Sequence, residues 1–197
     1  MLIVISSPDQ IEAEARHINN LFSAGMQLFH LRKPDWSIEE IEYLIKNIEK
    51  EYRTRIALHQ YHQMAKDFGI NRLHFTEHLR NTTAPEMLNE LLDNGFTLST
   101  SVHNLQVYAA LPKQFNYCFI GPVFNSISKK NYSANINLSA YKITGNTTNP
   151  IAIGGIDENR ITEVIELGYG GAAILGSIWS NPDQCVAQFK KIHQLWF

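Results

Sequence analysis

The stretch PIAIGGIDENRITEVIELGYGGAAILGSI, residues 150–178, contains two short apolar runs with one helical pattern between them. The runs Pro150–Ile153 and Ala172–Leu175 are nearly continuous, as is typical of strands covered on both faces of a parallel sheet. The residues between them recur at the spacing of one helix face: Ile161, Val164, Ile165 and Leu167. The stretch therefore predicts one strand–helix–strand unit of a parallel sheet.

The same alternation of strand and helix patterns extends over the whole chain. Eight runs rich in β-type residues are expected to be strands. They are Leu2–Ser6, Leu28–Leu31, Arg55–His59, Arg72–Phe75, Thr97–Ser101, Tyr117–Gly121, Pro150–Ile153 and Ala172–Leu175. Two of the intervening helices carry start signals, namely Ser37 with Glu40 three residues later, and Asp157 ahead of the Ile161 helix.

Eight units within 197 residues leave about 25 residues for each, close to the lower size limit of a (β/α)8 barrel. No linker or change of composition divides the chain, so we expect a single α/β domain, a (β/α)8 TIM barrel over residues 1–197. An open, doubly wound parallel sheet is the alternative. In a barrel, functional side chains lie on the loops that follow the carboxyl ends of the strands.

The composition excludes several classes of protein. A net charge of −2 argues against binding nucleic acid through phosphate neutralisation. No apolar run approaches the roughly 20 residues of a membrane span, and the amino terminus lacks the basic region of a signal peptide. Cys118 and Cys185 have no zinc-site spacing, so we expect free thiols in a cytoplasmic protein that contacts neither nucleic acid nor membrane.

Several predicted strand ends carry groups that suit a phosphorylated ligand. Arg32 and Lys33 follow the second strand, and an arginine can bind phosphate through two parallel hydrogen bonds. The long loop after the sixth strand contains Ser126, Ser128 and Lys129. The turns after the last two strands contain glycine, which lets backbone N–H groups approach a phosphate, and this pair of loops is a recurrent phosphate site in barrels.

Histidines also gather at the predicted strand ends. His59 and His62 follow the third strand, and His74 and His78 lie around the end of the fourth. Their spacing matches no compact zinc motif, so hydrogen bonding to a substrate or packing under the loops is favoured over metal binding. His103 follows Ser101, but no acidic residue accompanies the pair, which argues against a Ser-His-Asp triad.

Taken together, several segments resemble thiamine phosphate synthase and the related TenI-type thiazole tautomerase over essentially the whole chain. The resemblance rests on segments that occur in one order. They are Leu31-Arg32, Ser101-Val102-His103, Gly121-Pro122-Val123-Phe124 with Ser126, Ser128 and Lys129, Ile153-Gly154-Gly155-Ile156 and Gly168 to Ile178. The family implies a (β/α)8 barrel that couples hydroxymethylpyrimidine diphosphate to thiazole phosphate in thiamine biosynthesis and releases pyrophosphate.

The resemblance also implies roles for individual residues. Arg32, Ser101 and Lys129 match the family's catalytic positions, at which Arg32 and Lys129 contact the diphosphate and the pyrophosphate. The remaining matches concern substrate binding. Ser126 and Ser128 match residues around the thiazole phosphate, and Gly155, Leu175 and Gly176 match its backbone cradle. Lys33, His30 and His59 are also expected to bind substrate.

The chain departs from the family pattern at the metal site. Family members bind Mg²⁺ through two aspartates, whereas this chain has Gln60, after His59, and Leu79 at the matching positions. Mg²⁺ is therefore expected for the family, but its ligands are not retained here, and we predict no metal ligand. Asp35 and Glu77 are the nearby carboxylates.

Three activities remain open at this stage. The first is thiamine phosphate synthesis. The second is a tautomerase-like isomerisation, although Pro122 stands where the tautomerase has its histidine, so that another histidine must move the proton. The third is a non-catalytic module that binds thiazole phosphate or thiamine phosphate. Small phosphorylated substrates are the expected partners in each case, and the chain is a possible homo-oligomer.

Overall fold

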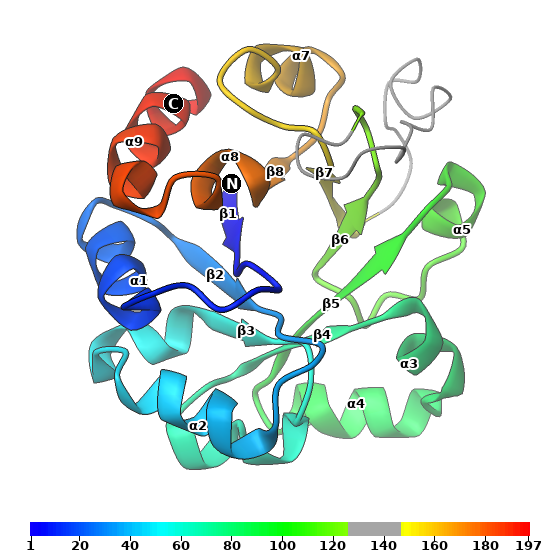
Figure 1. The fold of residues 1–197 in the computed structure, drawn as a ribbon. Coiled ribbons are helices and arrows are strands. Elements are labelled where there is room, and N and C mark those ends of the chain that lie inside the picture. Colours follow the sequence, from blue (N-terminus) through cyan, green and yellow to red (C-terminus); the bar gives the residue numbers. More distant parts are fainter. Residues whose placement is uncertain (126–146) are drawn as a thin grey trace.

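The structure is a computed structural model that describes residues 1–125 and 147–197. These residues form a closed barrel of eight parallel strands, in which each strand pairs with the next and β1 pairs with β8 (Figure 1). The strands are β1 (Leu2–Ile5), β2 (Leu28–Leu31), β3 (Ile56–Leu58), β4 (Arg72–Phe75), β5 (Thr97–Val102), β6 (Tyr117–Ile120), β7 (Asn149–Ile153) and β8 (Gly171–Ile174). The pairing of Leu2 with Ala172 closes the ring and excludes the open sheet.

Helices surround this barrel on the outside (Figure 1). The α-helices are α1 (Glu14–Ser23), α2 (Ile38–Lys46), α3 (Glu77–Thr82), α4 (Pro85–Asp93), α5 (Leu105–Ala109), α7 (Ile161–Glu166), α8 (Gly176–Trp179) and α9 (Cys185–Trp196). Short 3₁₀ helices cover Lys50–Arg55, His62–Met64, Lys66–Phe68 and Pro182–Gln184. Two of these 3₁₀ turns, not an α-helix, connect β3 to β4.

The two predicted helix starts have different outcomes. Ser37 and Glu40 form the expected capping box, in which each side chain accepts a hydrogen bond from the other residue's backbone N–H. Asp157 is not the cap of α7, because the helix begins at Ile161 and its N-cap position is Arg160. The Asp157 carboxylate instead accepts bonds from the N–H groups of Asn159 and Arg160, in the turn before the helix.

Alternation along the strands divides the core into two layers. Phe29 and Leu31 of β2 point outward and pack in the larger apolar cluster between barrel and helices. Leu28 of the same strand points inward and packs in a smaller cluster that fills the barrel. Because alternate residues share a face, His30 also points inward, above Leu28. The barrel interior is therefore apolar at one end and histidine-rich toward the carboxyl ends of the strands.

Two further expectations concern the thiols and the membrane. Cys118 and Cys185 are both buried and free, as the sequence predicts, and burial raises the pKa of the Cys118 thiol to about 12. Within the described ranges, none of the helices has the length and apolar character that crossing a membrane requires.

Candidate functional site

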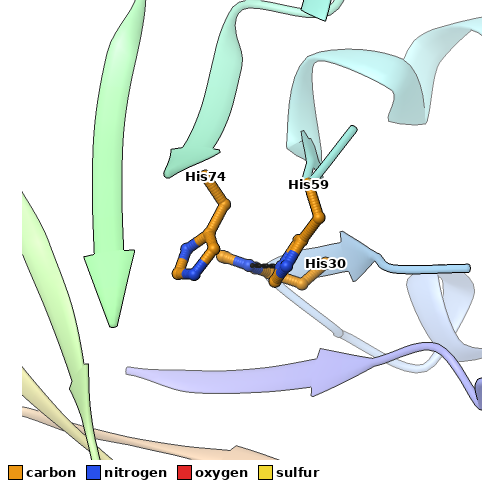
Figure 2. A group of neighbouring side chains, drawn as sticks. All are labelled: His30, His59 and His74. Carbon is orange, nitrogen blue, oxygen red and sulfur yellow. Dashed lines mark hydrogen bonds between the residues drawn. The ribbon is translucent and has the colours of Figure 1, made fainter. Parts of the chain in front are cut away.

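Three histidines from neighbouring strands converge inside the barrel mouth. His30 belongs to β2, His74 belongs to β4, and His59 directly follows β3. Figure 2 shows their imidazoles pointing toward one another, and nitrogens that could act as ligands all lie within 4.8 Å. The rings of His59 and His74 are stacked with centroids 4.0 Å apart. Sequence spacing could not show this cluster, because closure of the barrel brings together residues 15 to 44 positions apart.

A chain of hydrogen bonds connects the cluster to the barrel interior. His30 Nδ1 and His59 Nε2 share a hydrogen bond of 2.8 Å (Figure 2), and His30 Nε2 lies 2.7 Å from the Tyr117 hydroxyl. His74 is bonded at both nitrogens, to Ser99 Oγ at 2.9 Å and to Ser101 Oγ at 2.8 Å. His30 and His74 are therefore fixed in orientation, and both are almost completely buried.

Burial determines the charge state of the three imidazoles. It lowers the pKa of His74 to about 3 and lowers the pKa values of His30 and His59 well below the ordinary histidine value. The charge of Arg32 contributes to the lowered pKa values of His59 and His74, so this guanidinium acts on the cluster. At neutral pH the cluster is thus uncharged, and its nitrogens can accept as well as donate hydrogen bonds.

The adjacent cations Arg32 and Lys33 have different environments. Arg32 is exposed, and its backbone is held by Ser6, whose hydroxyl donates to the Arg32 carbonyl and accepts from the Arg32 N–H, both at 2.8 Å. Lys33 is fully buried, with its ammonium 2.6 Å from Glu14 and 4.4 Å from the Trp36 ring. Arg32 is therefore accessible to a ligand, whereas the Lys33 ammonium is already used in an internal ion pair.

Ser101 is positioned by His74 and by Arg80, and the sequence analysis did not identify Arg80 as part of the site. The Ser101 hydroxyl forms a hydrogen bond with His74, and the Ser101 carbonyl accepts a hydrogen bond of 2.6 Å from Arg80 of α3. Arg80 also donates to the Thr100 hydroxyl at 2.9 Å. Tyr117, below His30, is the second such residue in the wider network. Its place at the first position of a predicted strand gave no signal of its inward direction.

The glycine turn after β7 packs directly against the turn after β6. Gly154 and Gly155 have φ angles of +100° and +66°, a region that favours glycine. A Cβ on Gly155 would overlap the backbone oxygen of Asn125 and would lie 2.8 Å from the Phe124 Cβ. Val123 N–H further donates to the Ile153 carbonyl at 2.9 Å. The close contact of these two turns is therefore possible only without a side chain at position 155.

Of the other predicted phosphate contacts, the structure describes Leu175 and Gly176 but not those on the loop after β6. Leu175 and Gly176 follow β8, and Gly176 begins α8. The neighbouring Ser177 hydroxyl is buried and has no hydrogen-bond partner within the described ranges. It lines a cavity of about 260 Å³ whose lining also includes Asp157 and Glu158, and these carboxylates make that cavity unsuitable for a phosphate. Ser126, Ser128 and Lys129 lie outside the described residues.

The magnesium ion implied by the resemblance does not fit the groups present. Gln60 is engaged by its neighbour, since its amide donates to the Lys33 carbonyl at 2.6 Å and accepts from the Lys33 N–H at 3.3 Å. The Leu79 side chain has no oxygen, and the Glu77 carboxylate lies 3.6 Å from Arg80. Among the described residues, the ligand group that converges consists of imidazole nitrogens, whereas Mg²⁺ prefers oxygen ligands.

Two relatives with similar sequences are thiamine-phosphate synthases. The chain is 29% identical to the thiamine-phosphate synthase of Serratia proteamaculans over 182 residues, which cover 89% of this chain and 82% of that protein. It is 28% identical over 179 residues to the thiamine-phosphate synthase of Bacteroides thetaiotaomicron, with 85% and 84% covered.

Two of the similar solved structures are thiamine phosphate pyrophosphorylases. The thiamine phosphate pyrophosphorylase of Bacteroides thetaiotaomicron is 25% identical and superposes with a TM-score of 0.77, covering 98% of this chain and 96% of that one. The Pyrococcus furiosus thiamine phosphate pyrophosphorylase shares 15% identity, a TM-score of 0.76, and coverage of 99% and 94%. At that identity the second likeness concerns the fold alone.

The family match covers nearly all of the barrel. The model described as thiamine monophosphate synthase (TMP-TENI) matches residues 1–178, which include all eight strands and the turns after β7 and β8. By the extent of this match, the chain belongs to the thiamine monophosphate synthase family.

Proposed function

We propose that this protein is a thiamine phosphate synthase, joining hydroxymethylpyrimidine diphosphate to thiazole phosphate. The observation that carries the proposal is the position of Arg32. Its backbone is fixed by Ser6 at the end of β2, its side chain is exposed, and its charge acts on His59 and His74 in the mouth. An exposed guanidinium on a fixed backbone, beside the neutral histidine cluster, suits a diphosphate attached to a heterocycle.

The reaction exchanges one bond for another. The bond between the pyrimidine methylene carbon and the diphosphate oxygen breaks, and the electron pair leaves with pyrophosphate. The thiazole nitrogen then forms a bond to the methylene carbon, which gives thiamine phosphate. Negative charge grows on the leaving oxygen, so positive groups oriented toward it accelerate the step. Arg32 has this role in the proposal, together with Lys129 on the loop after β6.

The remaining residues bind and orient the substrates. Ser101 is held by His74 and Arg80 at the end of β5 and is proposed to contact the pyrimidine diphosphate. His30 is fully buried and bonded at both nitrogens, so it acts on a ligand through the partly exposed His59. Ser126, Ser128, Gly155, Leu175 and Gly176 remain the predicted contacts of the thiazole phosphate.

A coupling assay tests this proposal. The purified protein is mixed with both substrates, with Mg²⁺ in one series and Zn²⁺ in another, and thiamine phosphate is quantified by mass spectrometry. We expect product from the wild-type chain and a loss of about 100-fold in kcat/KM for Arg32→Ala. Arg16→Ala, which removes an exposed arginine on α1, is the matched control and should retain activity. Absence of thiamine phosphate in every series would refute the proposal.

An isomerase is the second candidate, favoured by the neutral histidine pair. His59 and His30 share a short hydrogen bond and are unprotonated at neutral pH, as a general base requires. The test follows isomerisation of carboxylated thiazole phosphate by NMR, and an unchanged substrate counts against this activity. A module that only binds would instead show thiazole phosphate or thiamine phosphate binding by calorimetry without turnover in either assay.

A further inference from the structure

We propose that His30, His59 and His74 bind one divalent transition-metal ion that prefers nitrogen ligands, such as Zn²⁺. The three side chains come from the ends of β2, β3 and β4, and their candidate ligand atoms all lie within 4.8 Å of one another. Two nitrogens bound to one tetrahedral Zn²⁺ lie about 3.4 Å apart. The widest pair therefore needs to close by about 1.4 Å at most, which a rotation of the imidazoles supplies.

The shared hydrogen bond of His30 and His59 marks one side of the site. His30 Nδ1 and His59 Nε2 approach to 2.8 Å, so two ring nitrogens already point into one small space, one as donor and one as acceptor (Figure 2). A metal ion would take the place of the shared proton, which would move to the other nitrogen of the donor ring, so that both imidazoles stay neutral. As a residue, His59 is less buried than His30 and His74, so its ring is the one that we expect to rotate, and the rotation would change its stacking on His74.

The groups around the cluster resemble the outer shell of a metal site. Metal-bound histidines almost always use their second nitrogen in a hydrogen bond, which fixes the ring and its tautomer. With Nδ1 on the metal, His30 retains its 2.7 Å bond from Nε2 to the Tyr117 hydroxyl. With Nε2 on the metal, His74 retains its 2.9 Å bond from Nδ1 to Ser99 and gives up only the bond to Ser101.

The electrostatic environment keeps the imidazole ligands neutral and requires an anion beside the metal ion. Burial keeps all three histidines uncharged, which is the form that ligates metals. The charges of Arg32, Arg72 and Arg80 also act on the cluster and would repel a dication, so the metal ion needs a negatively charged ligand at its fourth position. A diphosphate oxygen would meet this need, and only this last step rests on the proposed function.

Metal binding is tested on the full-length chain prepared without a histidine tag. Equilibrium dialysis with Zn²⁺ and elemental analysis should give one ion per chain, and Co²⁺ should produce the visible absorption bands of a tetrahedral site. His59→Gln removes the partly exposed ligand while preserving a polar side chain, and should lower the affinity by about 100-fold or more. His78→Ala, an exposed histidine on α3, is the matched control and should bind like wild type.

The design separates loss of binding from loss of folding. His30 and His74 are both buried, so His59→Gln carries the test and His74→Asn supports it, and thermal unfolding confirms that each variant is folded. Absence of stoichiometric binding in the wild type, or equal binding in His59→Gln and wild type, would overturn the proposal. Because the readout is metal content and absorption, the result stands whether or not the protein forms thiamine phosphate.

Discussion

At the scale of single residues, Arg32 and Lys33 show what a sequence motif leaves open. Both are basic, adjacent and located at a strand end, and both were expected to bind an anionic ligand. The partner of Lys33 is Glu14, which lies on the preceding helix and is 4% exposed. Only the packing of α1 against the barrel brings the two together. The choice between ligand binding and an internal ion pair therefore depends on tertiary contacts that a local pattern does not contain.

The buried pair predicts a difference between neighbouring substitutions. Lys33→Met leaves the Glu14 carboxylate buried without its ammonium partner and should lower the free energy of unfolding by about 3–5 kcal/mol. The double variant Lys33→Met/Glu14→Leu should recover most of that loss, because no charge then remains buried. Urea unfolding of both variants is the measurement, with Arg32→Met as the control, expected within about 0.5 kcal/mol of wild type. Equal effects of Arg32→Met and Lys33→Met would contradict the assignment.

The neutral histidines predict a pH dependence of stability in the metal-free protein. Their folded pKa values lie below the ordinary value of 6.5, and that of His74 is lowered to about 3. The unfolded chain therefore binds more protons below pH 6.5, so the free energy of unfolding falls as the pH drops from about 6.5 toward 3. Each histidine contributes a slope of up to about 1.4 kcal/mol per pH unit.

Urea unfolding at several pH values with a chelator present measures this slope. His74→Asn removes one of the three groups and should make the dependence shallower. A stability that does not change between pH 6.5 and 4.5, or a slope unaffected by His74→Asn, would show that the cluster is not held neutral.

At the scale of elements, the strands were more predictable than the connections between them. The eight predicted strands agree with the structure to within one residue at either end. Continuous apolar runs are a strong local signal because both faces of a barrel strand are buried. The connection between β3 and β4 carries only 3₁₀ turns, and Asp157 acts one turn before its helix. These features depend on contacts with neighbouring elements, so the local sequence predicts them poorly.

The turn after β7 gives a test at this scale. Gly155→Ala places a Cβ against the Asn125 oxygen at a φ of +66° and should cost more than about 2 kcal/mol of stability. Gly168→Ala has a similar φ of +84° with nothing within 4 Å of the added carbon, so it should cost about 1 kcal/mol. Chemical denaturation compares the two, and an equal cost would mean that the turns after β6 and β7 do not pack as described.

At the scale of the whole molecule, barrel closure explains which parts of the site the sequence could reveal. The closed barrel follows from the count of strands, and the location of the site at their carboxyl ends follows from the barrel. The convergence of His30, His59 and His74 could not be predicted in this way, because it depends on the inward direction and the register of three separate strands. The spacing argument accordingly favoured hydrogen bonding over metal binding for these histidines. Only the three-dimensional structure shows that a chain without the family's two aspartates has a histidine cluster in the barrel mouth.

We propose that this barrel catalyses the coupling reaction with an altered set of side chains at its mouth. The most direct measurement is ³¹P NMR of one reaction containing the protein, hydroxymethylpyrimidine diphosphate, thiazole phosphate and a divalent metal ion. We predict that inorganic pyrophosphate and thiamine phosphate appear together in a 1:1 ratio, and that both rates fall about 100-fold in Arg32→Ala. Unchanged substrate signals with folded wild-type protein, or pyrophosphate release without thiamine phosphate, would contradict the claim.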